Sequence, residues 1–379
     1  MKKLFSVILV LVILALIAFS CSKPSSGTSG PTAFKPSNTP TLSGSQIAAT
    51  STALLYTITP TATISPTATI TPTPYPGGNW VIETGQAAFD PRDSHTSVVY
   101  NNSMWVIGGI NNSNGDYNDV WYSNNGADWF AATANAAFVP RDSHTSVVYN
   151  NYMWVIGGWS IDIDCDAQGY CGGPLNDVWY SPDGVNWVQA INTSGVIFSP
   201  RYSHTSVVYN NYMWVIGGAD ENNNVLNDAW YSADGVTWNE ATAGAAFVAR
   251  DGAASIATAS DMWIFGGVDS YNYDLNDTFY SPDGANWSLG TEAAAFTPRD
   301  GHSAVYFNNI MYVIGGYDYQ GNLDNDLYGS MDGANWSVVT SAAAFTPRVF
   351  HSSVVFNNEM WVIGGYTTGG DVNDVWHSE

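Results

Sequence analysis

The sequence predicts an all-β fold, a six-bladed β-propeller, because one unit of about 50 residues recurs six times. The arginines show this most clearly: all six occupy one repeated position, 49 residues apart except for a single interval of 60. A Gly-Gly pair recurs with the same spacing, and runs of β-branched and aromatic residues lie between these marks. Repeats of this length are typical of arrays in which each unit buries its faces against its neighbours. The arginines are Arg92, Arg141, Arg201, Arg250, Arg299 and Arg348.

The residue pattern within each unit predicts four short antiparallel strands. In the second unit, residues 145–149 and 152–156 are β-branched and aromatic runs, and the Asn150-Asn151 pair between them favours a tight hairpin. A third strand is predicted over 176–181, and a fourth begins at 186–188 after a Pro-Asp-Gly turn. Four-stranded blades arranged radially leave no long exposed sheet edge.

The order of residues within the unit resembles the kelch repeat of the galactose oxidase and kelch-like propellers. It runs Pro-Arg, a histidine three residues on, Gly-Gly, Asn-Asp-Val-Trp and a late tryptophan, and it covers residues 78–379 almost completely. The last unit ends at 374–379 without its fourth strand. Trp80, however, precedes Arg92 by the same twelve residues that separate Trp129 from Arg141. We therefore expect an N-terminal strand to complete the last blade and close the ring.

Residues 1–20 have the pattern of a signal peptide. Lys2-Lys3 precede an apolar run from Leu4 to Phe19, which is too short for a typical membrane-spanning helix. The segment that ends in Cys21, Ala-Phe-Ser-Cys, resembles the lipobox of bacterial lipoproteins. This resemblance implies a lipidated Cys21 at the mature N-terminus. An ordinary signal peptide and an uncleaved anchor are the alternatives.

Residues 21–77 are rich in Ser, Thr, Pro and Ala and contain no acidic residue, so we expect a disordered tether that carries the lipidated cysteine. The predicted organisation is a signal peptide at 1–20, the tether at 21–77 and the propeller at 78–379. We expect the protein to be lipid-anchored in a bacterial cell envelope, on the extracytoplasmic side, with the membrane contacted only through the anchor.

The charge of the predicted propeller excludes a nucleic-acid partner. Residues 78–379 contain six arginines, no lysine and 33 acidic residues, a formal charge of −27. Phosphate binding requires clustered cations, which this composition does not supply. We interpret the acidity mainly as a solubility feature of a monomer, with a site for cations or basic partners as the alternative.

One face of the propeller is expected to carry the functional loops. The connections between second and third strands emerge on the same side as those between blades, and only short hairpins lie on the other side. Loops on a rigid scaffold are the usual place for binding residues. The candidate loops are 159–175, 219–226, 268–275 and 317–324. Their aromatic residues, which could stack against a sugar or a peptide or could simply pack neighbouring loops together, are Trp159, Tyr170, Tyr271, Tyr273, Tyr317 and Tyr319.

The 159–175 loop is 17 residues long, about twice the length of its counterparts, and carries two further motifs. Its cysteines, Cys165 and Cys171, are expected to form a local disulfide in an exported protein. Its alternating carboxylates, Asp162, Asp164 and Asp166, resemble the start of a calcium loop. Because the glycine and glutamate of such a loop are missing, a solvated acidic loop is the favoured interpretation and Ca²⁺ the alternative.

Each arginine is expected to pair with an aspartate at the start of a third strand, since the guanidinium group fits a carboxylate with two parallel bonds. Such a ring would tie strands or blades together; a cationic mouth for an anionic ligand is the alternative. The partners are Asp119, Asp177, Asp228, Asp277, Asp326 and Asp374. Histidines follow five of the arginines by three residues, and Ala253 takes the sixth place. A ring of near-identical residues suits structure better than catalysis.

The leading functional hypothesis is a surface-tethered binding or interaction module for a glycan or a protein, with no required cofactor. One alternative is an exported kelch enzyme such as a sialic-acid mutarotase, which would need Arg and Glu around the channel. Another is a purely structural surface protein. Resemblance to galactose oxidase would imply copper held by Tyr and His together with a Cys–Tyr crosslink. With Cys21 assigned to lipid and the other two cysteines to each other, we expect no copper, and enzymatic activity is the less favoured interpretation.

Overall fold

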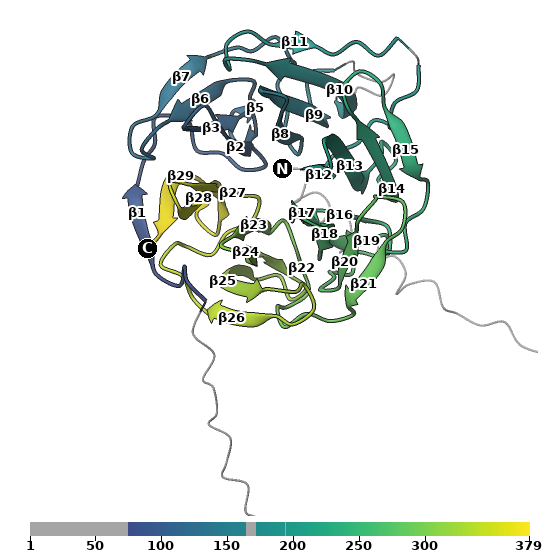
Figure 1. The fold of residues 1–379 in the computed structure, drawn as a ribbon. Coiled ribbons are helices and arrows are strands. Elements are labelled where there is room, and N and C mark those ends of the chain that lie inside the picture. The colour runs from purple at the N-terminus through teal and green to yellow at the C-terminus, as the bar shows by residue number, and fades with distance from the viewer. Residues whose placement is uncertain (1–74, 164–171, 194) are drawn as a thin grey trace, which may run out of the picture. The chain divides into compact units, whose positions relative to one another are not determined.

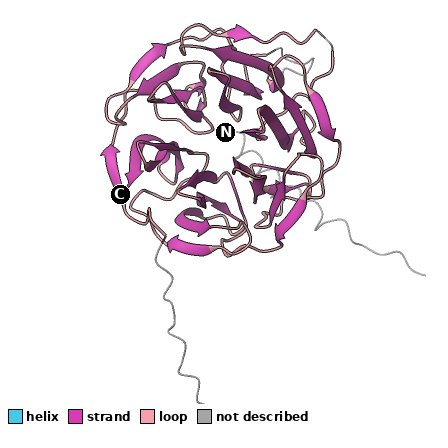
Figure 2. Ribbon diagram, viewed as in Figure 1, coloured by secondary structure: helices cyan, strands magenta, loops and turns pink. Residues whose placement is uncertain are grey.

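The computed structural model describes residues 75–163, 172–193 and 195–379. Residues 73–379 form one compact unit. Six blades surround a central axis, and the first strand lies beside the last (Figure 1). All of the described secondary structure is strand, joined by turns and loops (Figure 2), so this part of the chain contains no helix that could cross a membrane. The predicted all-β, six-bladed propeller is therefore confirmed.

Each blade contains four antiparallel strands, ordered from the axis outward. The first three blades are β2 (Thr96–Tyr100), β3 (Ser103–Ile107), β6 (Val120–Ser123) and β7 (Phe130–Thr133); β8 (Thr145–Tyr149), β9 (Tyr152–Ser160), β10 (Gly173–Ser181) and β11 (Val188–Gln189); and β12 (Thr205–Tyr209), β13 (Tyr212–Ala219), β14 (Val225–Ser232) and β15 (Asn239–Thr242). The others are β17 (Ala254–Ala257), β18 (Met262–Phe265), β20 (Thr278–Ser281) and β21 (Ser288–Thr291); β23 (Ser303–Phe307), β24 (Ile310–Asp318), β25 (Leu323–Ser330) and β26 (Ser337–Thr340); and β27 (Ser352–Phe356), β28 (Glu359–Thr367), β29 (Gly370–Ser378) and β1 (Trp80–Thr84).

Short additional strands extend the blades on the loop side. β4 (Ile110–Asn111) pairs with β5 (Gly115–Asp116), β16 (Arg250–Asp251) with β19 (Val268–Asp269), and β22 (Arg299–Asp300) with β24. In the second blade, β9 continues through Ser160 and β10 begins at Gly173, so the ends of the expected 159–175 loop belong to strands.

The N-terminal strand closes the ring, as the register of the tryptophans predicted. β1 pairs antiparallel with β29, with Trp80 opposite Ser378 and Ile82 opposite Trp376. Residues at the two ends of the propeller thus form one sheet. The closure of the last blade by residues from the start of the propeller is confirmed.

The hairpins between first and second strands form because asparagine tolerates positive φ. Asn150 and Asn151 have φ of 48° and 61°, and the Asn-Asn pairs of four other blades adopt the same conformation. Two successive residues with positive φ match the twist of a two-residue hairpin. We call the side of the propeller that carries these turns the hairpin face, and the opposite side the loop face.

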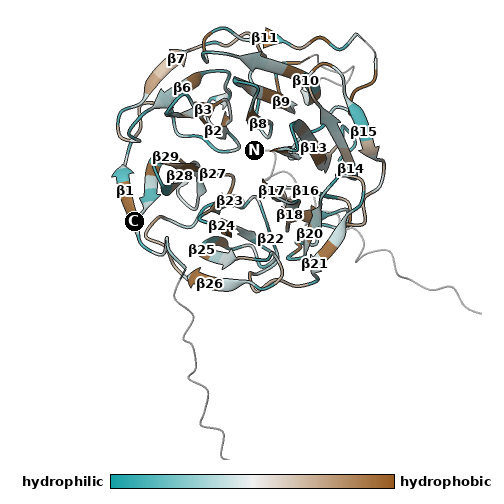
Figure 3. Ribbon diagram, in the orientation of Figure 1, coloured by the Kyte–Doolittle hydropathy of each residue, from teal (hydrophilic) through white to brown (hydrophobic). Residues whose placement is uncertain are grey.

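Packing between blades buries the tryptophans of the second strands and those at or directly before the start of the fourth strands. Hydrophobic clusters each combine residues of two adjacent blades; one contains Val98 and Trp105 of the first blade with Met153 and Trp187 of the second. Hydrophobic and hydrophilic residues are interspersed along the strands (Figure 3), as expected where alternate side chains enter the packing. The Asp-Gly turns also contribute: the backbone of Gly284 lies so close to the Trp214 ring that a Cβ would overlap it.

The segment before β1 replaces one of these turns. Tyr75 packs against the hydrophobic cluster between the fifth and sixth blades, beside the backbone of Gly329. The Tyr312 hydroxyl donates a 3.0 Å hydrogen bond to the carbonyl of Pro76. β1 then starts opposite the end of β29, close to the hairpin that precedes β28. The chain therefore enters the propeller on the hairpin face.

Candidate functional site

The six arginines are held inside the blades. The side chain of Arg92 donates to Asp119 with Nη1–Oδ1 and Nη2–Oδ2 distances of 2.6 and 2.9 Å, and to the carbonyls of Asp90 and Gly108. The same bonds recur in every blade, and all six arginine side chains are fully buried. The remaining pairs are Arg141–Asp177, Arg201–Asp228, Arg250–Asp277, Arg299–Asp326 and Arg348–Asp374.

In these ion pairs every arginine of the propeller is neutralised by an aspartate of the same blade. Burial acts to raise the pKa of Asp177, but the hydrogen bonds and charge of Arg141 outweigh it and hold that pKa below its ordinary value. The Trp179 indole N–H also donates to this carboxylate, at 2.7 Å. Since the six arginines are the only Arg or Lys residues of 78–379, none is presented to a ligand at the channel mouth.

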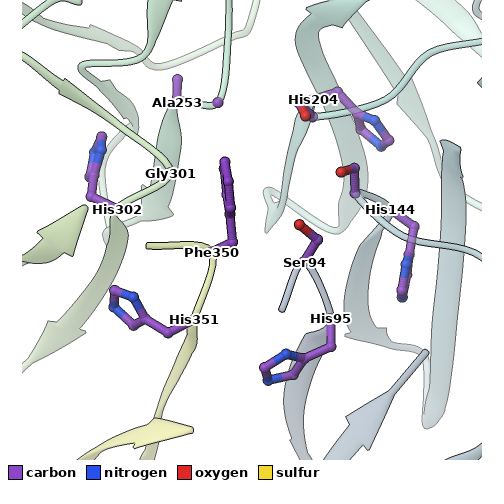
Figure 4. A pocket seen from close by; sticks show the side chains of 12 residues that line it. Ser94, His95, His144, His204, Ala253, Gly301, His302, Phe350 and His351 are labelled. Carbon is purple, nitrogen blue, oxygen red and sulfur yellow. The ribbon is translucent and has the colours of Figure 1, made fainter. Parts of the chain in front are cut away.

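A closed ring of backbone hydrogen bonds encircles the channel mouth. One residue per blade, directly before the histidine position, donates its N–H to the carbonyl of its counterpart in the preceding blade, at 2.9–3.0 Å. All six residues have φ between 50° and 62°. They are Ser94, Ser143, Ser203, Gly252, Gly301 and Phe350, and they line a cavity of about 160 Å³ with the histidines (Figure 4).

Phe350 is the exception in this ring. A bulky side chain at a φ of 56° is a conformational outlier, and the equivalent residue in every other blade is serine or glycine. Its aromatic ring lies against Gly301, where a Cβ would overlap it, and Figure 4 shows it beside Gly301 at the mouth. The mouth is therefore lined by serines on one side and by phenylalanine, glycine and alanine on the other.

The histidine rings form contacts between adjacent blades. His144 Nε2 lies 3.0 Å from the Thr96 hydroxyl of the preceding blade, and His204 Nε2 lies 2.9 Å from that of Thr145. Burial, followed by the nearby Arg201 charge, lowers the pKa of His204 to about 3, so its ring is neutral at ordinary pH. The same causes act on His95, His144, His302 and His351. These rings are structural acceptors and donors rather than proton-transfer groups at neutral pH.

One seam between blades departs from this pattern. Ala253 and Ala254 occupy the places of the histidine and the hydroxyl residue in the fourth blade. His302, which follows, consequently lacks the hydroxyl partner that the other four histidines have, and its ring is buried beside Ala253 at the mouth. The hydroxyl network around the axis is interrupted at this seam.

A carboxyl group at the rim has an unusual environment. Asp93, which directly precedes Ser94, is buried and accepts a 2.7 Å hydrogen bond from the Ser94 hydroxyl. Burial, and next the proximity of Asp371, raise the pKa of Asp93 to about 8. Asp142, Asp251 and Asp300 occupy the same place in three other blades. These four aspartates were not among the predicted site residues; their signal in the sequence is the acidic residue that directly follows four of the arginines.

The candidate aromatic residues divide into two groups. Trp159 packs edge-to-face against Tyr202 with ring centroids 5.2 Å apart. Tyr271, Tyr273 and Tyr319 instead project into solvent, with 77%, 68% and 62% of their surfaces exposed. Tyr273 and Tyr319 line a cleft of about 440 Å³ between the loops of the fourth and fifth blades. Tyr317 is less exposed, and its hydroxyl lies over Gly321 of the same turn.

Several predicted residues lie outside the described part of the chain. They are Cys21, Asp164, Cys165, Asp166, Tyr170 and Cys171. Asp162 is described: it is exposed, and its backbone N–H donates to the Ser160 hydroxyl. Within the ranges that the structure describes, no group of three His, Cys, Asp or Glu side chains is placed to hold a metal. The lipid anchor, the disulfide and the calcium alternative stay predictions.

Comparison with known proteins identifies the architecture. A family model described as the KLHDC2/KLHL20/DRC7 Kelch-repeats domain matches residues 79–240, and one described as the Attractin/LZTR1 beta-propeller matches residues 170–376, more than half of the chain. The chain belongs to the kelch-repeat β-propellers. A solved structure titled "Structure of YjhT" superposes on this kelch propeller with a TM-score of 0.64 and 18% sequence identity, covering 77% of this chain and 96% of the other. At that identity the likeness concerns the fold. No curated protein matched the sequence.

Proposed function

We propose that this kelch propeller is a surface-tethered binding module that presents its loop face to an uncharged or cationic ligand. The observation that carries the proposal is the contrast in exposure between the arginine and the tyrosine side chains. The arginines are buried and neutralised, whereas tyrosines such as Tyr271 and Tyr273 are largely exposed on the loop face. Aromatic side chains held in solvent by a rigid scaffold are common ligand contacts.

The route of the chain supports the tethered arrangement. Because residues 75–79 approach β1 on the hairpin face, an attachment on the N-terminal side does not have to cross the loop face. The described residues of the loops 219–226, 268–275 and 317–324 then stay accessible in a tethered protein. Lipidation of Cys21 and an extracytoplasmic location in a bacterial envelope are parts of this proposal.

The enzymatic alternative has less support. A sialic-acid mutarotase would need arginines that reach an anionic sugar, and every arginine of the propeller is bonded to an aspartate inside a blade. The histidines of the channel mouth are buried and neutral, with the pKa of His95 lowered to about 3 by burial. The described mouth therefore offers neither an anion clamp nor a histidine that titrates near neutral pH.

Two measurements test the proposal. Mass spectrometry of the mature N-terminus should find a lipid-modified Cys21, and an unmodified cysteine would remove the anchor from the proposal. The full chain in detergent should be screened for binding to glycans and to envelope proteins. We expect a ligand whose binding is abolished by substitutions on the loop face. A screen without any binder would favour the purely structural surface protein, and interconversion of sialic-acid anomers would establish the enzyme instead.

A further inference from the structure

Three neighbouring blades carry the same five-residue turn on the loop face. The turns begin at Asp220, Asp269 and Asp318, and in each one carboxylate oxygen accepts the backbone N–H groups of the second and fourth residues that follow, at 2.8–2.9 Å. The third residue after each aspartate has positive φ: Asn223, Asn272 and Gly321. The three turns therefore share one backbone conformation, fixed by a buried or partly buried carboxylate, and differ only in the side chains they present.

Aromatic residues occupy these turns only in the fourth and fifth blades. The last position is asparagine in two turns, and there Asn224 and Asn322 donate back to the carboxylates of Asp220 and Asp318 at 3.0 and 3.1 Å. Tyr273 takes that position in the fourth blade, and its ring projects into solvent instead. The residue directly after the aspartate is Glu221 in the third blade and Ser270 in the fourth, but Tyr319 in the fifth. The fourth blade also has Tyr271, two residues after Asp269. Three tyrosines are thus added to a turn that forms without them in the third blade, and the two at its outer positions are Tyr273 and Tyr319.

These two tyrosines meet across one cleft. Tyr273, Asn272 and Asp274 of the fourth blade face Tyr319 of the fifth, and Pro298 completes the lining. The cleft volume of about 440 Å³ lies within the range of about 300–1,000 Å³ that small-ligand sites occupy. Tyr271 lies beside Tyr273 with ring centroids 6.5 Å apart and extends the aromatic surface. Because the turns are fixed by hydrogen bonds, binding would not need to order them first.

We propose that this cleft binds an uncharged oligosaccharide, an inference that rests on the proposed function and specifies its ligand. A sugar ring offers apolar C–H faces that suit the rings of Tyr273 and Tyr319, and hydroxyl groups that suit the amide and carboxyl groups of Asn272 and Asp274. The cleft has a carboxyl group in its lining and no Arg or Lys, so it disfavours sialylated or sulfated glycans.

The neighbouring turns supply the test variants. Tyr273→Asn and Tyr319→Ser each introduce a residue that the same turn carries in another blade, and the new asparagine has the Asp269 carboxylate within reach of its amide, as Asn224 has that of Asp220. Both variants should fold. The full chain in detergent is screened on an array of neutral, amino-sugar, sialylated and sulfated glycans, and the neutral glycans that bind are titrated by calorimetry. We expect each variant to weaken binding at least tenfold. Met331→Ala, which truncates an exposed side chain on the hairpin face, should change nothing.

The outcomes separate this inference from the broader one. Neutral glycan binding that survives Tyr273→Asn and Tyr319→Ser but is lost in Trp159→Ala overturns the cleft assignment and leaves a glycan-binding module. A preference for sialylated or sulfated glycans overturns the assigned ligand class, as does a ligand that is only a peptide or protein. If neither glycans nor envelope proteins bind the intact chain, both the inference and the proposed function fail.

Discussion

Acidification below about pH 6.5 should destabilise the propeller, because its buried histidines are neutral in the folded protein and take up protons only on unfolding. Five histidines are buried and neutral in the folded protein, with the pKa values of His95, His204 and His302 lowered to about 3 mainly by burial. In the unfolded chain the same imidazoles have a pKa near 6.5, so unfolding takes up protons below that pH. A lowered folded-state pKa means that stability is lost as the pH falls below 6.5.

The size of the effect follows from the proton difference. Between pH 7.5 and 5.5, each histidine contributes a loss of about 1.4 kcal/mol, or roughly 7 kcal/mol for the five. Asp93 acts in the opposite direction, because its raised pKa of about 8 makes the folded state take up a proton over this interval, which offsets roughly 2–3 kcal/mol. Asp324, whose pKa burial raises to about 6, adds a smaller offset. The net loss should be about 3–4 kcal/mol.

Guanidinium unfolding of the full chain, followed by tryptophan fluorescence at pH 7.5 and 5.5, measures this loss directly. A matched variant is His204→Gln, which keeps a hydrogen-bonding group next to Thr145 and removes one titrating ring. It should reduce the pH-dependent loss by about 1.4 kcal/mol. Equal free energies of unfolding at the two pH values, or a higher value at pH 5.5, would refute the reasoning that these rings stay neutral.

Three further predictions concern the scaffold. Asp228→Ala should lower the free energy of unfolding by about 3–5 kcal/mol because it leaves the buried Arg201 charge unpaired, whereas the double change with Arg201→Met should recover most of that loss; equal losses in the two proteins would contradict it. Gly284→Ala should destabilise by roughly 2–4 kcal/mol because its φ is 72° and a Cβ would overlap Trp214, while Gly244→Ala, in open space, should have little effect in the same unfolding assay. Asp93→Asn should raise stability at pH 9, where the buried carboxylate is charged, and change it less at pH 6; calorimetric melting at both values checks the sign, and an equal shift at the two would exclude this cause.

The repeat made most of the scaffold predictable. Because each residue of one blade has a counterpart in the next, six concordant copies averaged out the ambiguity of any single strand, and the twelve-residue offset from Trp80 to Arg92 placed the closing strand. The aspartate partner of each arginine could likewise be anticipated from register, since an arginine just before a first strand and an aspartate just before a third share one end of the blade.

The asymmetric features could not be predicted in the same way. Phe350 and Asp93 acquire their properties from contacts between blades, with Gly301 and with Asp371, that no pattern within one unit records. The separation of Trp159 from the exposed tyrosines depends on which way each loop side chain turns. Trp159 continues β9 and meets Tyr202, whereas the carboxylate-bound turn at Asp269 directs Tyr273 outward. Substitutions that break the repeat are therefore the best sequence signal for the site.

The contacts of residues 75–76 have a mechanical consequence for a tethered protein. β1 is the strand that closes the ring, and its first pair joins Trp80 to Ser378 at the C-terminal end of β29. Tension applied at the N-terminus would peel this sheet from that end, one pair at a time. Tyr75 and Pro76, however, are attached to the fifth blade ahead of β1, through packing beside Gly329 and the bond from Tyr312. A force on the N-terminus would therefore act first on these contacts with the fifth blade. It would reach the hydrogen bonds between β1 and β29 only after the contacts of Tyr75 and Pro76 had broken.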